Sequence, residues 1–187
     1  MALTTLDPNT ALIIVDLQKG IVGFPFIHPI DGVVDRSRAL LSAFRQRGLP
    51  VVLVNVAGVA PGRTERPRHS ASFPAGWTDF IPELDQQQSD IVVTKRTWGA
   101  FSNTDLENQL KRLGVTQVVI SGVATGTGVE ATARQAYEHG FNVTLAIDAM
   151  TDSRSEAHVY SIENVFPKLG ETGTTQDIID LLAMRSA

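Results

Sequence analysis

Short runs of apolar residues recur along the chain, and each is bounded by polar residues or by Gly and Pro. The runs are rich in Val and Ile and carry few charges, which is typical of strands buried on both faces of a parallel sheet. The first run ends on the carboxylate of Asp16. We therefore expect strands at residues 10–16, 51–56, 91–94, 117–121 and 142–147, and a weaker sixth strand at residues 166–169.

Helical patterns lie between these runs. In residues 33–47 the apolar positions share one face and arginines occupy the other. The predicted buried face of this helix consists of Val33, Val34, Ser37, Leu40, Leu41 and Phe44. Capping boxes begin two further helices, one at Thr104 with Glu107 and one at Ser153 with Glu156. Helices are also expected at residues 104–113, from Glu130 to His139, and at residues 175–184. Strands alternating with helices predict a single three-layer α/β/α domain over residues 1–187, with a parallel sheet covered on both sides.

Composition narrows the function mainly by exclusion. The 187 residues are 43% hydrophobic and 19% charged, which is ordinary for a soluble globular domain. A formal net charge of −4 without any basic cluster gives no reason to expect nucleic acid. The absence of cysteine removes disulfides, thiolate ligands and a cysteine nucleophile. The first apolar run is too short to span a membrane and has no basic flank, so we expect a cytoplasmic protein without membrane contact.

The longest irregular stretch covers residues 57–90 and contains four prolines. A loop of this length inside a compact domain usually carries function or forms contacts between subunits. Both interpretations remain open from the sequence.

Polar groups follow several of the predicted strands. Asp16, Lys95 and Asp148 each end a run, and the glycine-rich turn at residues 122–128 follows the fourth strand. In parallel sheets ligands bind beyond the carboxyl ends of the strands. The turn also leads into a helix, so we expect the N–H groups of residues 126–129 to face an anion.

Aromatic residues occur in the loops near these groups. Phe24, Phe26, Trp98 and Phe101 could line a pocket for an apolar or ring-shaped molecule, or could pack against a neighbouring subunit. The sequence does not separate these two possibilities.

Three motifs in this order and spacing resemble those of the isochorismatase-like hydrolase superfamily. The motifs are IIVDLQ at residues 13–18, TK at residues 94–95 with WGAF at residues 98–101, and GVAT at residues 122–125 with VEATAR at residues 129–134. The resemblance covers nearly the whole chain and implies a six-stranded parallel sheet flanked by helices, with a Rossmann-like arrangement.

Most members of that superfamily hydrolyse amides through a thioester, using an Asp-Lys-Cys triad. By resemblance Asp16 matches the Asp and Lys95 matches the Lys. A cis peptide is implied between Val123 and Ala124. The position of the nucleophile is occupied by Gly128, which has no side chain and cannot form a covalent adduct.

The isochorismatases of the superfamily also have glycine at this position and cleave a vinyl ether without a covalent intermediate. The resemblance therefore implies a hydrolase acting on a small, anionic molecule, with Asp16 as general acid/base, Lys95 as its electrostatic partner and water completing the reaction. The residues implied in substrate or oxyanion binding are Gln18, Phe24, Trp98, Phe101, Val123, Ala124, Thr125, Gly126 and Thr127. A general acid needs a raised pKa, whereas a nearby lysine lowers the pKa of a carboxyl group, so burial of Asp16 must outweigh Lys95.

No metal or other cofactor is expected. The metal-binding members place Asp-x-His after the second strand, where this chain has Asn55, and only His69 follows nearby. The resemblance also implies a homodimer or homotetramer. A competing hypothesis is a catalytically silent relative that binds a small carboxylate or serves as an interaction subunit.

Overall fold

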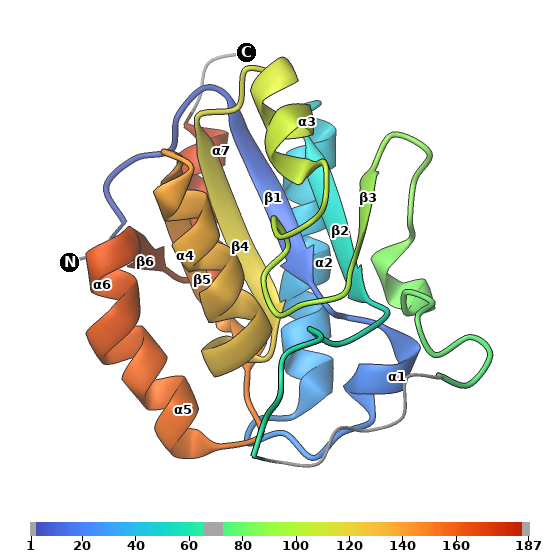
Figure 1. Ribbon diagram of the computed structural model, residues 1–187. Helices are drawn as coiled ribbons and strands as arrows, with labels where there is room; N and C mark the ends of the chain where they lie inside the picture. Colours follow the sequence, from blue (N-terminus) through green and yellow to red (C-terminus); the bar gives the residue numbers. More distant parts are fainter. Residues whose placement is uncertain (1–2, 66–72, 185–187) are drawn as a thin grey trace.

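The computed structural model describes residues 3–65 and 73–184. Its centre is a six-stranded sheet in which all neighbouring strands are parallel, in the order β3-β2-β1-β4-β5-β6 (Figure 1). The strands are β1 (Thr10–Val15), β2 (Val51–Val56), β3 (Ile91–Lys95), β4 (Gln117–Val123), β5 (Asn142–Thr151) and β6 (Glu171–Gly173). The predicted parallel sheet is confirmed, and the first five apolar runs each form a strand.

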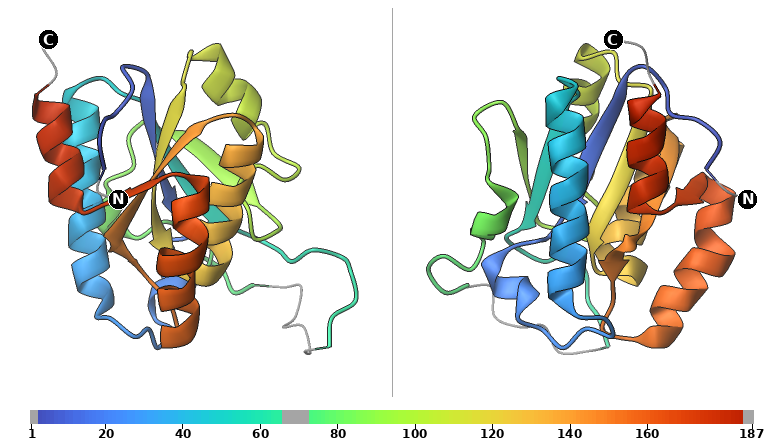
Figure 2. Two further views of the ribbon diagram at one scale, coloured as in Figure 1. Left: turned by 90° about the vertical axis from the view of Figure 1, so that its left-hand side faces the viewer. Right: turned by 180° about the vertical axis from the view of Figure 1, so that it is seen from behind.

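Helices cover both faces of this sheet. They are α1 (Lys19–Val22), α2 (Ile30–Gln46), α3 (Leu106–Arg112), α4 (Glu130–Glu138), α5 (Ser155–Tyr160), α6 (Phe166–Leu169) and α7 (Thr175–Ala183). Three further short turns are η1 (Pro82–Leu84), η2 (Thr125–Val129) and η3 (Ser161–Val165). Helices α3, α4 and α6 lie on one face, and α2 and α7 lie on the other, as the two sides of the molecule show (Figures 1 and 2).

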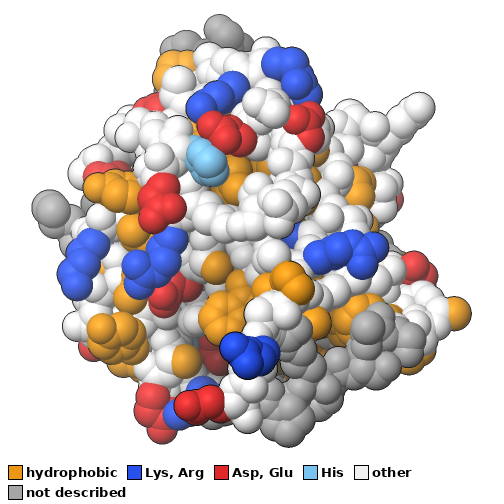
Figure 3. Space-filling view, viewed as in Figure 1, with side chains coloured by type: hydrophobic (Ala, Val, Ile, Leu, Met, Phe, Trp, Pro, Cys, Tyr) orange, Lys and Arg blue, Asp and Glu red, His pale blue; other side chains and the backbone are white. Residues whose placement is uncertain are grey.

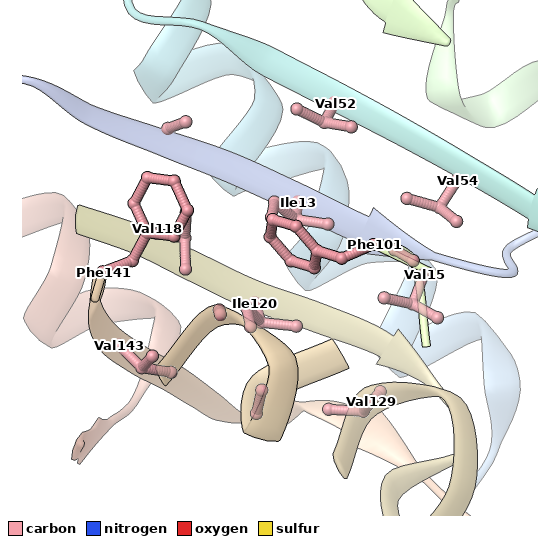
Figure 4. Close-up of a cluster of buried hydrophobic side chains, with 14 of the residues drawn as sticks. Ile13, Val15, Val52, Val54, Phe101, Val118, Ile120, Val129, Phe141 and Val143 are labelled. Carbon is pink, nitrogen blue, oxygen red and sulfur yellow. The ribbon is translucent and has the colours of Figure 1, made fainter. Parts of the chain in front are cut away.

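The layers enclose one apolar cluster on each side of the sheet. Successive residues of β1 point to opposite faces, so Ile13 packs in one cluster and Ile14 in the other (Figure 4 shows the first cluster). Every residue of β1 is buried, which explains why its sequence is a continuous apolar run. The buried face of α2 consists of the residues expected from its periodicity: Val33, Val34, Ser37, Leu40, Leu41 and Phe44.

The prediction of a strand at residues 166–169 is wrong. These residues form α6, and the sixth strand is the polar segment Glu171–Gly173 that follows. Phe166 and Leu169 are three residues apart and pack on the same apolar cluster, and Pro167 fits the first turn of a helix. β6 is a three-residue edge strand, too short and polar to give an apolar signal.

The expectation that Asp148 ends the fifth strand is also wrong. β5 continues to Thr151 because Ala149 and Met150 are buried and extend the apolar pattern beyond Asp148. The Asp148 carboxylate accepts hydrogen bonds from the N–H and hydroxyl of Thr175 and pairs with Arg36. Asp148 therefore fastens α7 and α2 to the sheet.

Neither predicted capping box forms. α3 begins after Asp105 without a side-chain cap, and the Thr104 hydroxyl donates to the carbonyl of Ala100 instead. α5 begins after Arg154, whose N–H donates to Asp152 rather than to Ser153. A reciprocal capping box does occur at the start of α7, between Thr174 and Asp177.

The strand order changes direction between β1 and β4, because the chain builds β2 and β3 on one side of β1 and β4 to β6 on the other. Crevices at such a point, beyond the carboxyl ends of the strands, are the usual ligand sites of open parallel sheets. Within residues 3–65 and 73–184, no helix combines the length and apolar character that a membrane crossing requires.

Candidate active site

Asp16 lies directly after β1, at the point where the strand order reverses. Its N–H donates to the carbonyl of Val54 at 2.9 Å, which holds the backbone against β2. Its φ of 54° turns the chain away from the strand direction. The side chain is 7% exposed, and its Oδ1 has no hydrogen-bond partner among the described residues.

Lys95 reaches Asp16 from the end of β3, across the intervening strand β2. Its Nζ lies 2.7 Å from Asp16 Oδ2 and 3.3 Å from the carbonyl oxygen of Thr97, and it donates to both. The lysine side chain is 2% exposed, so the ion pair is shielded from solvent. A buried charge needs such a partner, because transfer from water is costly.

Burial and the lysine shift the pKa of Asp16 in opposite directions. Removal from water disfavours the charged carboxylate and is the larger effect, while the charge and hydrogen bond of Lys95 favour it. The net result raises the pKa of Asp16 from 3.8 to about 6. The condition that burial must outweigh Lys95 is therefore met.

The glycine-rich turn brings Gly128 against this pair. The peptide between Val123 and Ala124 is cis, as the resemblance implied, and η2 follows it. A Cβ built on Gly128 would lie 3.2 Å from Asp16 Oδ2 and 3.1 Å from the Val123 carbonyl oxygen. At the strand end, a side chain on Gly122, with φ of 109°, would collide with the backbone of β1.

The expected row of free N–H groups in this turn does not form. Gly126 donates its N–H to Asp152 Oδ2 at 2.8 Å, and Thr127 and Val129 donate theirs to the carbonyl of Ala124. The carbonyl of Ala124, inside the turn, takes two of these N–H groups, and the sequence did not reveal Asp152 as the acceptor for the N–H of Gly126. The anion site expected at residues 126–129 is thus reduced to the neighbourhood of Gly128.

A cavity of about 710 Å³ opens above Asp16 and Lys95. Of the residues expected in the site, those that line it are Asp16, Lys95, Gly128, Thr127, Phe24 and Trp98. The lining residues that sequence reasoning missed are Ile21, Val56, Gly58, Val59, Phe73, Trp77 and Thr97. Hydrophobic side chains gather on the lower part of the face in Figure 3, where the carboxyl ends of the strands lie.

The other expected binding residues lie outside this lining. Phe101 is buried in the apolar cluster between the sheet and α4 (Figure 4). Gln18 is fully buried and its side-chain atoms are bound to backbone groups of Val56 and Trp77. Thr125 is fully buried and hydrogen-bonds His158. Val123, Ala124 and Gly126 shape the turn, and none of the three lines the cavity.

The family can now be stated from a comparison of sequences. A family model described as the isochorismatase domain matches residues 10–177. The chain belongs to the isochorismatase family. An uncharacterized isochorismatase family protein, YwoC of Bacillus subtilis, is 39% identical over 182 residues, covering 92% of this chain and 93% of YwoC.

A solved structure agrees with this assignment. The isochorismatase family protein from Burkholderia thailandensis is 40% identical, covers 96% of this chain and 98% of its own, and superposes with a TM-score of 0.92. A more distant relative, named maleamate amidohydrolase, from Pseudomonas putida, is 26% identical over 92% of this chain and 86% of its own length. The chain is thus an isochorismatase-family hydrolase.

Among the described residues, no metal ligands group near this site. Asn55, the last residue but one of β2, occupies the place expected for the metal motif, and its amide donates to the carbonyl of Thr78. In residues 3–65 and 73–184, no three His, Asp or Glu side chains are arranged to hold a metal ion. His69 lies outside the described residues.

Proposed function

We propose that the protein hydrolyses a small molecule without a metal ion and without a covalent intermediate, with Asp16 transferring the proton. The observation that carries the proposal is the place of Asp16, buried on the floor of a cavity and hydrogen-bonded to Lys95, where burial raises its pKa to about 6. A carboxyl group with this pKa is present in both protonation states near neutral pH, which suits a general acid/base.

Gly128 supports the absence of a covalent step. It occupies the family position of the nucleophile and offers no side-chain atom to attack a substrate. Its bare backbone faces Asp16 Oδ2, so a substrate bond and a water molecule can approach the carboxyl group there.

The chemistry then needs only this chain and water. Protonated Asp16 gives its proton to the substrate as the bond to the leaving group weakens. Water adds to the resulting electrophilic carbon, and its released proton returns to the Asp16 carboxylate. Lys95 stabilises the carboxylate that exists between the two transfers and orients Oδ2 by its hydrogen bond.

The walls of the cavity favour a substrate with an apolar or planar body. Most of the lining side chains are apolar, including those of Phe24, Phe73, Trp77 and Trp98. The lysine in the described lining is already paired with Asp16, so the lining itself gives no added support to an anionic substrate. A vinyl ether or a related bond in a ring-bearing molecule fits these features.

The test is a substrate screen followed by mass spectrometry, with isochorismate and small amides included. Asp16→Asn keeps the shape of the side chain but cannot transfer a proton, so product formation should fall by at least about 100-fold. Asp148→Asn is a matched control, since Asp148 also projects from the sheet but binds Thr175 and Arg36 away from the cavity. Full turnover by folded Asp16→Asn would overturn the proposal.

A second candidate is an amidase site that has lost its nucleophile. It is favoured by the position of a Cβ at Gly128, which would face the Asp16–Lys95 pair, and by the relative named for an amidohydrolase reaction. Gly128→Cys should then gain hydrolysis of simple amides while wild type shows none. A catalytically silent binding protein predicts instead that a ligand raises the melting temperature and no product forms in either variant.

A further inference from the structure

We propose that Gln18 is a positioning residue that determines substrate specificity. It fixes the position of Trp77, which with Phe73 forms the aromatic wall of the cavity. The proposal rests on the proposed function only in treating this cavity as the substrate site. Gln18 follows Asp16 by two residues. One short segment would therefore carry both the reacting carboxyl group and the residue that positions Trp77.

The contacts of Gln18 join two separate parts of the cavity lining. Its Oε1 accepts from the N–H of Val56 at 2.7 Å, and its Nε2 donates to the carbonyl of Val56 at 3.1 Å. The same Nε2 donates to the carbonyl of Trp77 at 3.2 Å. Val56 ends β2 and Trp77 belongs to the long loop, and both residues line the cavity.

Gln18 cannot act by touching the substrate directly. The residue is fully buried, it is not part of the lining, and its amide oxygen and nitrogen are both bound to the backbone. A buried amide that is fully hydrogen-bonded fixes its partners in place, because leaving either group unpaired is costly. Its influence therefore passes through Trp77.

The indole ring of Trp77 packs on the residues next to Gln18. The N–H of Gly20 donates to the Trp77 carbonyl at 2.9 Å, and a Cβ on Gly20 would collide with the indole ring. The ring therefore lies directly on the Gly20 backbone. Phe73 stacks on Trp77, with ring centroids 4.1 Å apart and planes at 16°. The aromatic wall thus rests on the segment that begins at Asp16.

The loop that carries Trp77 is held by further contacts, most of them to the same segment after β1. The N–H of Lys19 donates to the carbonyl of Asp79, its ammonium group pairs with the Asp79 carboxylate, and the N–H of Ile81 donates to the carbonyl of Leu17. Nearer β3, Arg45 of α2 binds the carbonyl of Leu84 and the carboxylate of Asp90.

In the described part of this loop, the regular structure is the three-residue turn η1 and a single bridge between Gln18 and Phe80. Asn55 adds one side-chain hydrogen bond, to Thr78. A long segment with so little regular structure takes its position from such contacts.

The experiment follows the fluorescence of Trp77, because the chain contains only two tryptophans. In a Trp98→Phe background, Trp77 is the single emitter. Gln18→Met keeps the approximate shape of the side chain and removes its hydrogen bonds. We expect a red shift of the emission maximum and stronger quenching by acrylamide, because the indole moves away from the Gly20 backbone toward solvent.

The matched control is Gln117→Met in the same background. Gln117 is also buried and fully hydrogen-bonded, at the amino-terminal end of β4 and away from the cavity. It should lose thermal stability to a similar degree without moving the Trp77 emission. Equal changes in the two variants, or none in Gln18→Met, would overturn the proposal.

A second variant decides the case if Gln18→Met does not fold. Gln18→Asn keeps a buried amide but shortens the side chain by one methylene group, so the amide cannot bind Val56 and Trp77 together, and this variant should also shift and expose Trp77. An unchanged emission in folded Gln18→Asn contradicts the proposal. These readings need no substrate, so they stand even if the hydrolase proposal fails. Once a substrate is known, Gln18→Met should raise KM and relax selectivity between substrates more than it lowers kcat.

Discussion

At Asp16, burial and a neighbouring cation act on one carboxyl group in opposite directions, and burial is the stronger. Its pKa rises from 3.8 to about 6 on folding. The folded state therefore binds this proton more tightly than the unfolded state does. The stabilisation linked to it is fully present below about pH 4 and is lost as the pH rises through about 6, an effect of about 3 kcal/mol by pH 7.

Replacing Asp16 removes this pH dependence. The free energy of unfolding of Asp16→Asn, relative to wild type, should rise by about 3 kcal/mol between pH 4 and pH 7, measured by urea denaturation at each pH. Asp177→Asn serves as a control, because the hydrogen bonds of Thr174 lower the pKa of Asp177 below 3.8, so the stability linked to Asp177 changes only below about pH 4 and should stay nearly constant between pH 4 and pH 7. A stability difference for Asp16→Asn that does not change with pH contradicts the raised pKa.

Prediction at the residue scale succeeded where the position of a residue follows directly from the end of a strand. Asp16 and Lys95 each terminate an apolar run, so their convergence follows from the parallel sheet alone. The aromatic wall of Phe73 and Trp77 was missed, because the place of a long loop depends on contacts distant in sequence. Gln18 was predicted as a substrate ligand from its position in the motif, yet its amide binds the backbone.

At the scale of elements, the turn η2 is held by the end of β5 and by α5. Asp152 Oδ2 accepts the N–H of Gly126, its Oδ1 accepts the N–H of Arg154, and Thr125 hydrogen-bonds His158. Asp152 is 4% exposed, so its contacts are shielded from water. One carboxylate thus fixes the start of both η2 and α5.

Asp152→Ala should therefore destabilise the protein by about 1–3 kcal/mol, because the partly buried N–H of Gly126 loses its acceptor. Urea denaturation measures the loss. Asp105→Asn is the control, since Asp105 is exposed and its pairing with Arg112 lies on the surface. If both substitutions have equally small effects, η2 does not depend on Asp152.

Element prediction failed where the apolar pattern was too short to show its period. Four residues, FPKL, suit a buried strand as well as one helical turn, and here packing of Phe166 on the core selected the helix. The capping boxes failed for a related reason. The spacing was correct at Thr104 and Ser153, but the helices begin one or two residues later, where other partners were available.

For the whole molecule, the reversal of strand order between β1 and β4 brings the residues of the candidate site together. β1 supplies Asp16, β3 supplies Lys95 and the turn after β4 supplies Gly128, and all three meet at one edge of the sheet. The alternation of strands and helices was sufficient to predict this edge. The cavity above it, in contrast, depends on the loop after β2 and on the segment after β1.

Both tryptophans of the chain line this cavity, so intrinsic fluorescence reports on a single place in the molecule. A ligand that binds there should change tryptophan emission and raise the melting temperature with the same concentration dependence. At a free concentration of 100 times its Kd, the ligand should add about 2.7 kcal/mol to the free energy of unfolding. A second cavity, of about 420 Å³, lies at the opposite edge of the sheet beside Gln117 and Asn142, without a tryptophan in its lining. A ligand that raises the melting temperature but leaves the emission unchanged therefore binds away from Asp16, and a product-forming substrate with that behaviour would contradict the assignment of the active site.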